Sequence, residues 1–167
     1  MAQRRFARVR LEMIKEKTLY TDLRFLDTPQ KAAEFARSLY YEINENECRC
    51  PCKEQLMTCC VTTKNEPIVV EYTSIGDSQS TLASMKEIFL PAILTNSTGI
   101  ICFHNHPSGD PTPSIADKMM SKKLNDAGQI LGIEIVDNII ISESRGYYSF
   151  KENSFSSWGD EPLQNAG

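Results

Sequence analysis

The sequence predicts one α/β domain built around a mixed central sheet. Strand-like apolar runs alternate with segments of helical periodicity, which is typical of α/β proteins. Two strand-like runs are adjacent and joined by a short turn, which indicates an antiparallel pair, and no internal repeat occurs. With 167 residues, of which 41% are apolar and 24% charged, the chain is long enough to bury a core without disulfides or a structural metal.

The first half of the chain predicts one helix and a hairpin. Asp27-Thr28-Pro29 predicts a helix start, because proline is favoured in the first turn, and apolar residues recur at helical spacing up to about Ile43. The polar, Cys-rich stretch 44–53 follows as a loop. Residues 54–63 and 68–75 are rich in strand formers, and turn residues separate them, so they form the predicted hairpin.

The second half predicts two further strands and two helices. A helix is expected over 81–96, kinked or restarted at Pro91, and a buried strand over 99–106. The next helix is expected to begin at Ser114 and to end near Ala127, with Gly128 as its stop. The last predicted strand covers 133–142. The domain organisation that follows is a basic arm (1–24), one domain (25–152) and a flexible tail (153–167).

Charge is distributed unevenly along the chain. Residues 1–17 carry six Lys/Arg and two Glu, a local charge of +4, whereas the other 12 basic and 20 acidic residues sum to −8. The main body is therefore a poor general binder of nucleic acid, although the arm offers charges that suit a phosphate backbone. The sequence has neither a run of eighteen apolar residues nor a secretory h-region, so we expect a cytoplasmic protein with no membrane partner. No feature indicates an oligomeric state.

The six cysteines are expected to be thiols in a reducing compartment. Three of them lie in strand-like runs and are predicted to be small buried apolar residues: Cys59, Cys60 and Cys102. The other three form a Cys-x-Cys-x-Cys cluster: Cys48, Cys50 and Cys52. Three thiols are one short of a closed zinc site, and the two-residue spacing of such sites is missing, so an incidental loop is favoured over a second metal.

The segment that carries chemistry runs from His104 to Asp117. The protein has two histidines, His104 and His106, and residues two apart at a strand end point to the same face. Asp117 falls in the first turn of the next predicted helix. Two imidazoles and one carboxylate suit a catalytic Zn²⁺ whose fourth position is left to water. Ser114 and Asp117 also fit a helix-capping box, which describes the backbone and does not exclude a role at the site.

Two other metal-dependent classes fit less well. The name HNH nuclease describes dispersed positions and not the tripeptide His104-Asn105-His106. A zinc deaminase needs His-x-Glu and a later Pro-Cys-x-x-Cys, and the sequence contains neither.

The pattern His-x-His, seven residues, then Ser-x-x-Asp resembles the JAMM (MPN-plus) metalloprotease motif. The wider sequence resembles the RadC family of bacterial JAB-domain proteins over roughly residues 25–150, through RFLDTPQKAAEFARSL, KEIFLPAILTN, HNHPSGDPTPSIAD and LNDAGQILGIEIVDNIII. The resemblance implies a JAB/MPN fold, similar to the α/β/α layering of cytidine deaminases. It also implies that the zinc ligands are His104, His106 and Asp117.

The resemblance further implies an early glutamate that hydrogen-bonds the zinc water. Spacing alone does not choose among Glu45, Glu47, Glu54, Glu66, Glu71 and Glu87. The family places this acid at the start of the strand before an Asn-containing turn, which selects Glu54. The implied activity is hydrolysis of a peptide or isopeptide bond in a peptide or protein substrate. In it Glu54 transfers the proton, and Ser114 helps zinc to stabilise the oxyanion.

Two positions depart from the usual RadC pattern. Lys86 stands where arginine is common, and Asn138 stands where histidine often follows aspartate in the last strand. Neither is a ligand of the motif, so the departures concern substrate contacts and not the chemistry. Because RadC proteins are named for DNA repair, a protein that binds or acts on DNA is one alternative interpretation, with the basic arm as its support in the sequence. A second alternative is a pseudoenzyme scaffold, as in JAB domains that have lost ligands, and the intact ligand set argues against it.

Overall fold

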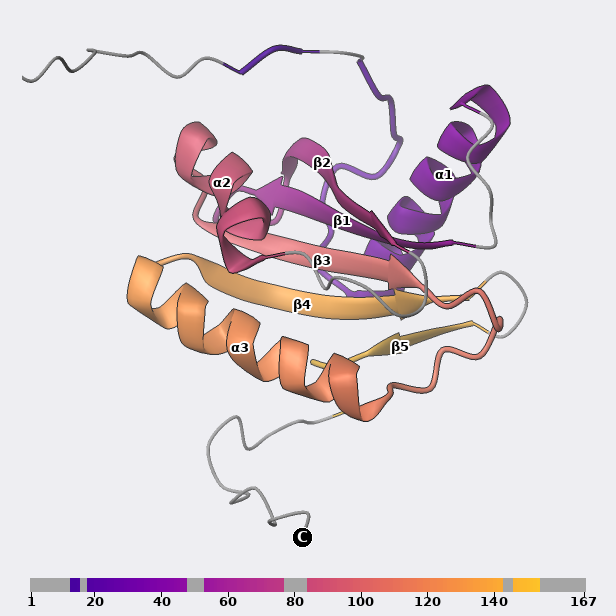
Figure 1. Ribbon diagram of the computed structural model, residues 1–167. Coiled ribbons are helices and arrows are strands. Elements are labelled where there is room, and N and C mark those ends of the chain that lie inside the picture. The colour runs from indigo at the N-terminus through magenta and orange to yellow at the C-terminus, as the bar shows by residue number, and fades with distance from the viewer. Residues whose placement is uncertain (1–12, 16–17, 48–52, 77–83, 143–145, 154–167) are drawn as a thin grey trace, which may run out of the picture.

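The chain folds into three layers, with a five-stranded sheet between helices on its two faces (Figure 1). The coordinates are a computed structural model, which describes residues 13–15, 18–47, 53–76, 84–142 and 146–153. The elements, in chain order, are α1 (Pro29–Glu47), β1 (Glu54–Val61), β2 (Pro67–Gly76), α2 (Met85–Thr95), β3 (Gly99–Asn105), α3 (Ile115–Leu131), β4 (Glu134–Ile141) and β5 (Tyr147–Ser149). The predicted α/β fold with a mixed central sheet is confirmed.

The strands lie in the order β2-β1-β3-β4-β5. β1 is antiparallel to both β2 and β3, β3 is parallel to β4, and β4 is antiparallel to β5. β1 and β2 form the predicted hairpin, and Asn65 in its turn has a φ of 60°. The parallel pair β3–β4 is joined by the crossover helix α3, as parallel neighbours require.

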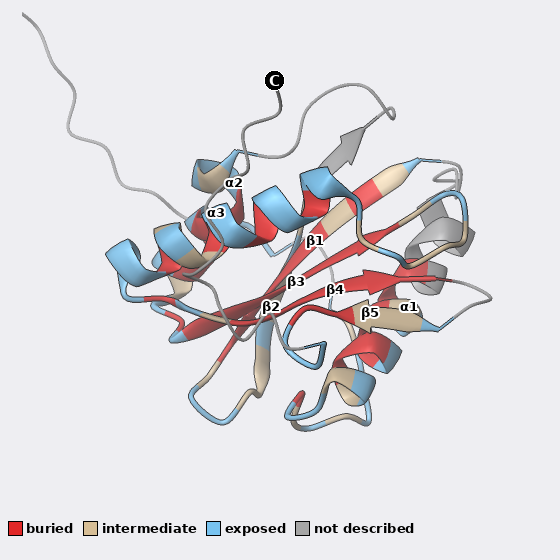
Figure 2. Cartoon of the chain, turned by 90° about the horizontal axis from the view of Figure 1, so that it is seen from below, coloured by how far each residue is buried: buried red, intermediate tan, exposed pale blue. Residues whose placement is uncertain are grey.

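Each face of the sheet has its own apolar core. Figure 2 shows α2 and α3 over one face and α1 over the other, with the central strands buried between them. The core under α1 also receives Leu26 and, at its edge, Leu19 and Leu23 from the segment before the helix. Leu26 is tied to the hairpin turn, because its N–H donates to the carbonyl of Asn65 at 2.8 Å.

The end of α3 corrects one prediction. Gly128 does not stop this helix but lies inside it, buried, and Gly132 is the C-cap with a φ of 68°. A Cβ on Gly128 would lie 2.6 Å from the carbonyl oxygen of Ile133. The glycine is therefore explained by the close approach of the chain that returns into β4, and the left-handed cap falls four residues later.

Other boundaries differ by smaller amounts. α2 begins after the N-cap Ser84 and runs through Pro91 as one helix, without a second start there. β3 ends at Asn105, so His106 is the first residue beyond the strand. The short strand β5 was not predicted, because three residues are too few to show an alternating pattern.

Cys59, Cys60 and Cys102 are buried free thiols, as predicted. Burial raises the pKa of Cys60 to about 11 and that of Cys102 to about 12, so both thiols are protonated and unreactive at neutral pH. The Cys48, Cys50 and Cys52 cluster, residues 1–12 and 16–17 of the basic arm, and tail residues 154–167 lie outside the described residues. None of the described helices combines the length and apolar character needed to cross a membrane.

Candidate metal centre

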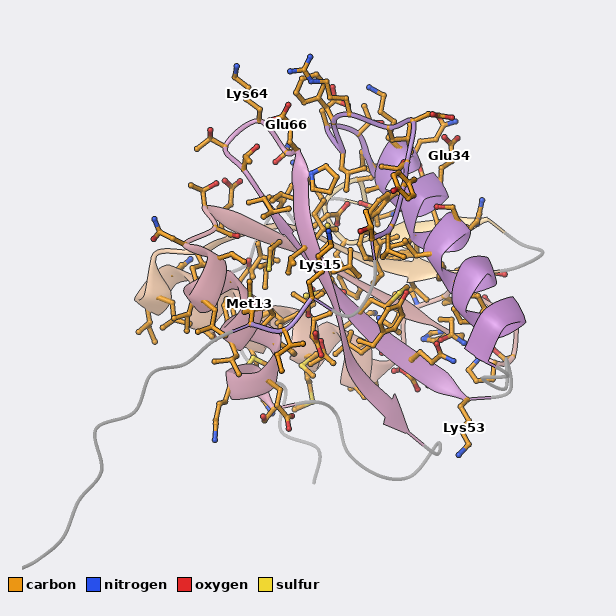
Figure 3. The ribbon with its side chains drawn as sticks, turned by 90° about the horizontal axis from the view of Figure 1, so that it is seen from above. Met13, Lys15, Glu34, Lys53, Lys64 and Glu66 are labelled. Carbon is orange, nitrogen blue, oxygen red and sulfur yellow. The ribbon has the colours of Figure 1, made fainter. Side chains whose placement is uncertain are left out.

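Three segments, one of them distant in the sequence from the other two, bring a cluster of polar side chains together at one end of the sheet. β3 carries His104, and His106 follows its last residue. The antiparallel register places Leu56 of β1 opposite His104, so Glu54, the first residue of β1, reaches the same end. Figure 3 shows Lys53 at this end of β1 and Lys64 and Glu66 at the hairpin turn at the other.

The potential ligand atoms of these residues lie close together. One atom from each of Glu54, His104, His106 and Asp117 falls within 4.8 Å of the other three. Asp117 is central, since its Oδ1 lies 3.2 Å from Nε2 of His104 and its Oδ2 lies 3.4 Å from Nε2 of His106. The side chains of His104 and Asp117 are only 7% and 8% exposed, whereas that of His106 is 15% exposed.

These distances fit a shared cation better than direct ion pairs. Charge-assisted N–H···O bonds are usually about 2.7–2.9 Å long, shorter than either contact. Atoms bound to zinc at about 2.0–2.1 Å with tetrahedral angles are separated by roughly 3.3 Å, close to both. In addition, Nε2 of His104 is buried without a hydrogen-bond partner. An unpartnered buried imidazole nitrogen facing a carboxylate and a second imidazole is what a metal site requires.

His106 is oriented by the loop that follows it. Its Nδ1 lies 2.7 Å from the carbonyl oxygen of Asp110, and because a carbonyl only accepts, Nδ1 carries the hydrogen. Nε2 of the neutral ring is then the nitrogen with a free lone pair, and it faces Asp117. Metal-binding histidines are commonly held in this way. Without metal, hydrogen bonding to Asp117 raises the pKa of His106 above its ordinary value, although partial burial opposes the effect.

Asp117 is oriented by the start of its own helix. The hydroxyl of Ser114 donates to Asp117 Oδ2 at 2.6 Å, and the backbone N–H of Ser114 donates to the same oxygen at 2.7 Å. The N–H of Asp117 returns a bond to Ser114 Oγ at 3.2 Å, which closes the predicted capping box. Burial raises the pKa of Asp117, but the neighbouring rings of His104 and His106 and the hydrogen bond from Ser114 outweigh it and hold the pKa well below its usual value. The carboxylate is therefore ionised and ready to bind a cation.

The structure thus brings all five predicted site residues to one end of the sheet. The Ser114 hydroxyl donates to Asp117 in this structure. It would have to rotate away from Asp117 to make the predicted contact with a reacting group. Sequence reasoning missed the orienting role of Asp110, which acts through its carbonyl and leaves no signal in residue type. It also missed Asn105, whose side chain points away from the two histidines beside it.

Comparison with known proteins agrees with the observed fold. A family model described as "RadC-like JAB domain" matches residues 26–155. A UPF0758 protein of Methanosarcina barkeri is 42% identical over 103 residues, which is 62% of this chain and 44% of the relative. A UPF0758 protein of Thermotoga maritima is 42% identical over 100 residues, which is 60% of this chain and 45% of the relative. A UPF0758 protein of Alkaliphilus metalliredigens is 45% identical over 102 residues, which is 61% of this chain and 44% of the relative.

The chain spans less than half the length of the curated relatives it matches.

Proposed function

Since this chain belongs to the RadC-like JAB domain family, we propose that it is a zinc-dependent hydrolase of the JAMM type that cleaves a peptide or isopeptide bond. One observation carries the proposal: Glu54, His104, His106 and Asp117 converge within 4.8 Å from three separate segments. Two imidazoles and one carboxylate form a ligand set of catalytic zinc. The carboxylate of the neighbouring Glu54 is then the group that accepts and donates the proton.

His104, His106 and Asp117 would hold the ion, through the two Nε2 atoms and the carboxylate. A zinc ion bound there would polarise a substrate carbonyl and make water a nucleophile near neutral pH. The Asp110 carbonyl and the Ser114 capping box keep two of the ligands in place before the ion binds. Preorganised ligands reduce the ordering that metal binding must otherwise impose.

Glu54 is the proton carrier of the proposed mechanism. Its carboxylate accepts the proton of the attacking water and delivers it to the leaving nitrogen, which must be protonated to depart as an amine. Glu54 and His106 are only partly buried, whereas the ligands His104 and Asp117 are buried, so we expect water and substrate to approach from the side of Glu54 and His106. The Ser114 hydroxyl, turned from Asp117 toward substrate, would donate to the developing oxyanion.

The test is a screen of peptide, isopeptide and nucleic-acid substrates with the wild-type protein and Glu54→Gln. Glutamine keeps the size of the side chain but does not accept the proton, and general-base catalysis contributes about 10²–10⁴-fold. We expect a loss of that order in amide hydrolysis, with the zinc content unchanged.

Glu66→Gln is the matched control, because Glu66 lies at the hairpin turn, at the opposite end of β1 (Figure 3). It should hydrolyse the substrate at the wild-type rate. A Glu54→Gln protein that keeps full activity on a zinc-dependent substrate would show that the proposed mechanism is wrong. Cleavage of nucleic acid alone would instead favour the DNA-directed alternative.

A further inference from the structure

The residue between the two histidines makes a second set of contacts. Asn105 is buried, and its side chain lies on the opposite face of β3 from His104. Its Oδ1 accepts a hydrogen bond from the N–H of Gln55 at 2.8 Å, and its Nδ2 donates to the carbonyl of Lys53 at 3.1 Å. Nδ2 also donates to Oη of Tyr40 in α1 at 3.1 Å. The two backbone partners flank Glu54, the proposed proton carrier.

These bonds lie where the pairing of β1 with β3 stops. That pairing runs from Val61 opposite Gly99 to Leu56 opposite His104. Glu54 and Gln55 lie beyond it, although β1 still pairs with β2 as far as Glu54. The side chain of Asn105 thus replaces the missing backbone pairing on the β3 side. It connects the strand that carries the metal ligands to the first residues of the strand that carries Glu54.

The two bonds act on both peptide units next to Glu54. The carbonyl of Lys53 belongs to the peptide before the Glu54 Cα, and the N–H of Gln55 belongs to the peptide after it. Because a peptide unit is planar, orienting both units restricts φ and ψ of the residue between them. The direction of the Glu54 side chain is therefore tied to Asn105.

Only an amide side chain of this length satisfies both partners. A backbone N–H needs an acceptor and a backbone carbonyl needs a donor, and the asparagine amide provides both side by side. Aspartate has no donor when ionised, and leucine has neither group. The same partners determine which atom of the amide is oxygen and which is nitrogen. In the reverse orientation the amide NH2 would face the Gln55 N–H, and the amide oxygen would face the Lys53 carbonyl.

We propose that Asn105 is a positioning residue, which holds Glu54 over the metal centre by clamping the peptide units on either side of it. The inference rests on the proposed function in that Glu54 is taken as the proton carrier. Misplacing a reacting group by about 1 Å can cost about 10²-fold in rate. Because the Asn105 side chain bonds Gln55, Lys53 and Tyr40 on the face of β3 opposite His104, its removal should act on catalysis through Glu54 and leave the metal ligands in place.

The clamp is tested directly by amide hydrogen exchange in the zinc-loaded protein. In Asn105→Leu the Gln55 N–H loses its acceptor and should exchange about tenfold faster or more, as expected for one lost hydrogen bond in a local opening. The amides of Met57 and Cys59, further along β1, should keep the wild-type rate. Asn105→Ala makes the same comparison if the leucine variant does not fold.

Asn138→Leu is the matched control, because it makes the same substitution at an equally buried asparagine of β4. It should leave exchange at Gln55 unchanged. If Asn105→Leu changes exchange at Gln55 by less than twofold, or accelerates Met57 and Cys59 equally, the clamp is wrong.

The effect on Glu54 is tested by a double-mutant cycle on a peptide substrate that the wild type hydrolyses. Asn105→Leu should retain one zinc per chain and lower kcat by about 10–100-fold, yet change the residual rate of Glu54→Gln by less than twofold. The same fold-loss in both backgrounds would overturn the positioning role. If the wild type cleaves no substrate, the proposed function fails, while the exchange experiment still decides whether Asn105 holds β1.

Discussion

Asp117 has two roles, one in the start of α3 and one in the candidate metal centre. It closes the capping box of α3 with Ser114, and its carboxylate faces both histidines. A helix start is a natural place for such a carboxylate, since the N-terminal dipole favours negative charge. Stability of the helix and geometry of the metal centre therefore depend on the same hydrogen bonds.

This double role predicts a specific effect of Ser114→Ala. Loss of an N-cap costs about 1 kcal/mol of folding free energy. Because Asp117 Oδ2 also loses its hydroxyl donor, zinc affinity should fall by about 10–100-fold, as for other partners of metal ligands. Thermal unfolding of the metal-free protein and zinc titration measure the two effects separately.

Ser84→Ala provides the control for that prediction. Ser84 closes an equivalent capping box with Glu87 at the start of α2, and neither belongs to the candidate metal centre. The variant should lose a similar stability while keeping the wild-type zinc affinity. Equal zinc affinities in both serine variants would mean that Ser114 does not orient Asp117.

The residues of the candidate metal centre differ in how well the sequence alone identifies them. His104, His106 and Asp117 lie within fourteen consecutive residues of the sequence, so spacing on a strand end and a helix start was enough to group them. Glu54 was different, because it joins them only through the antiparallel register of β1 and β3. Without the resemblance to a family, six glutamates were equivalent. The Asn105 contacts depend on the same long-range register.

At the scale of the element, α3 shows why local rules place a helix start better than its end. Ser114 and Asp117 form a local capping pattern, and the predicted start was confirmed. The predicted end was wrong because Gly128 and Gly132 look alike in sequence. Gly128 is required by contact with Ile133 and Ile135, which lie after the helix, and Gly132 by its positive φ.

Glycine-to-alanine substitutions in α3 follow from this difference. Helix propensity alone would favour Gly128→Ala by about 1 kcal/mol. We expect destabilisation by about 1–3 kcal/mol instead, because the new Cβ would overlap the Ile133 carbonyl and force the chain apart. Gly132→Ala should cost about 1–2 kcal/mol through its left-handed backbone, although it has open space. Denaturant unfolding measures the stability of both variants. A Gly128→Ala protein more stable than the wild type would contradict the close approach of Gly128 to the Ile133 carbonyl.

At the scale of the whole molecule, the three layers place the candidate centre where β1, β3 and α3 meet. Two buried cores fix the relative positions of these elements, so the ligands are held by the fold as well as by their neighbours. The alternation of apolar strands and amphipathic helices made the α/β class predictable. The strand order was not, because neighbouring strands such as β1 and β3 are joined only by long-range pairing.

The pH dependence of stability follows from the site. In the metal-free protein the pKa of His106 is higher in the folded than in the unfolded state, where it is about 6.5. The stability that this difference contributes is fully present below pH 6.5 and is lost as the pH rises through the folded pKa. The lowered pKa of Asp117 contributes stability above about 3.8, which is lost as pH falls through its folded pKa. Zinc, by contrast, binds neutral imidazoles.

The increase in Tm caused by zinc should therefore be small near pH 5 and larger near pH 8. Thermal unfolding with and without zinc across this range measures it. An increase independent of pH would indicate ligands other than the histidines.

The most direct test of the central claim is the zinc content of the purified protein, measured by elemental analysis against protein concentration. The four converging side chains predict about one zinc per chain, retained in Glu54→Gln. They also predict its loss in the double variant His104→Ala/His106→Ala, with that protein still folded. A folded double variant that retains the full equivalent of zinc would contradict the assignment of the metal centre.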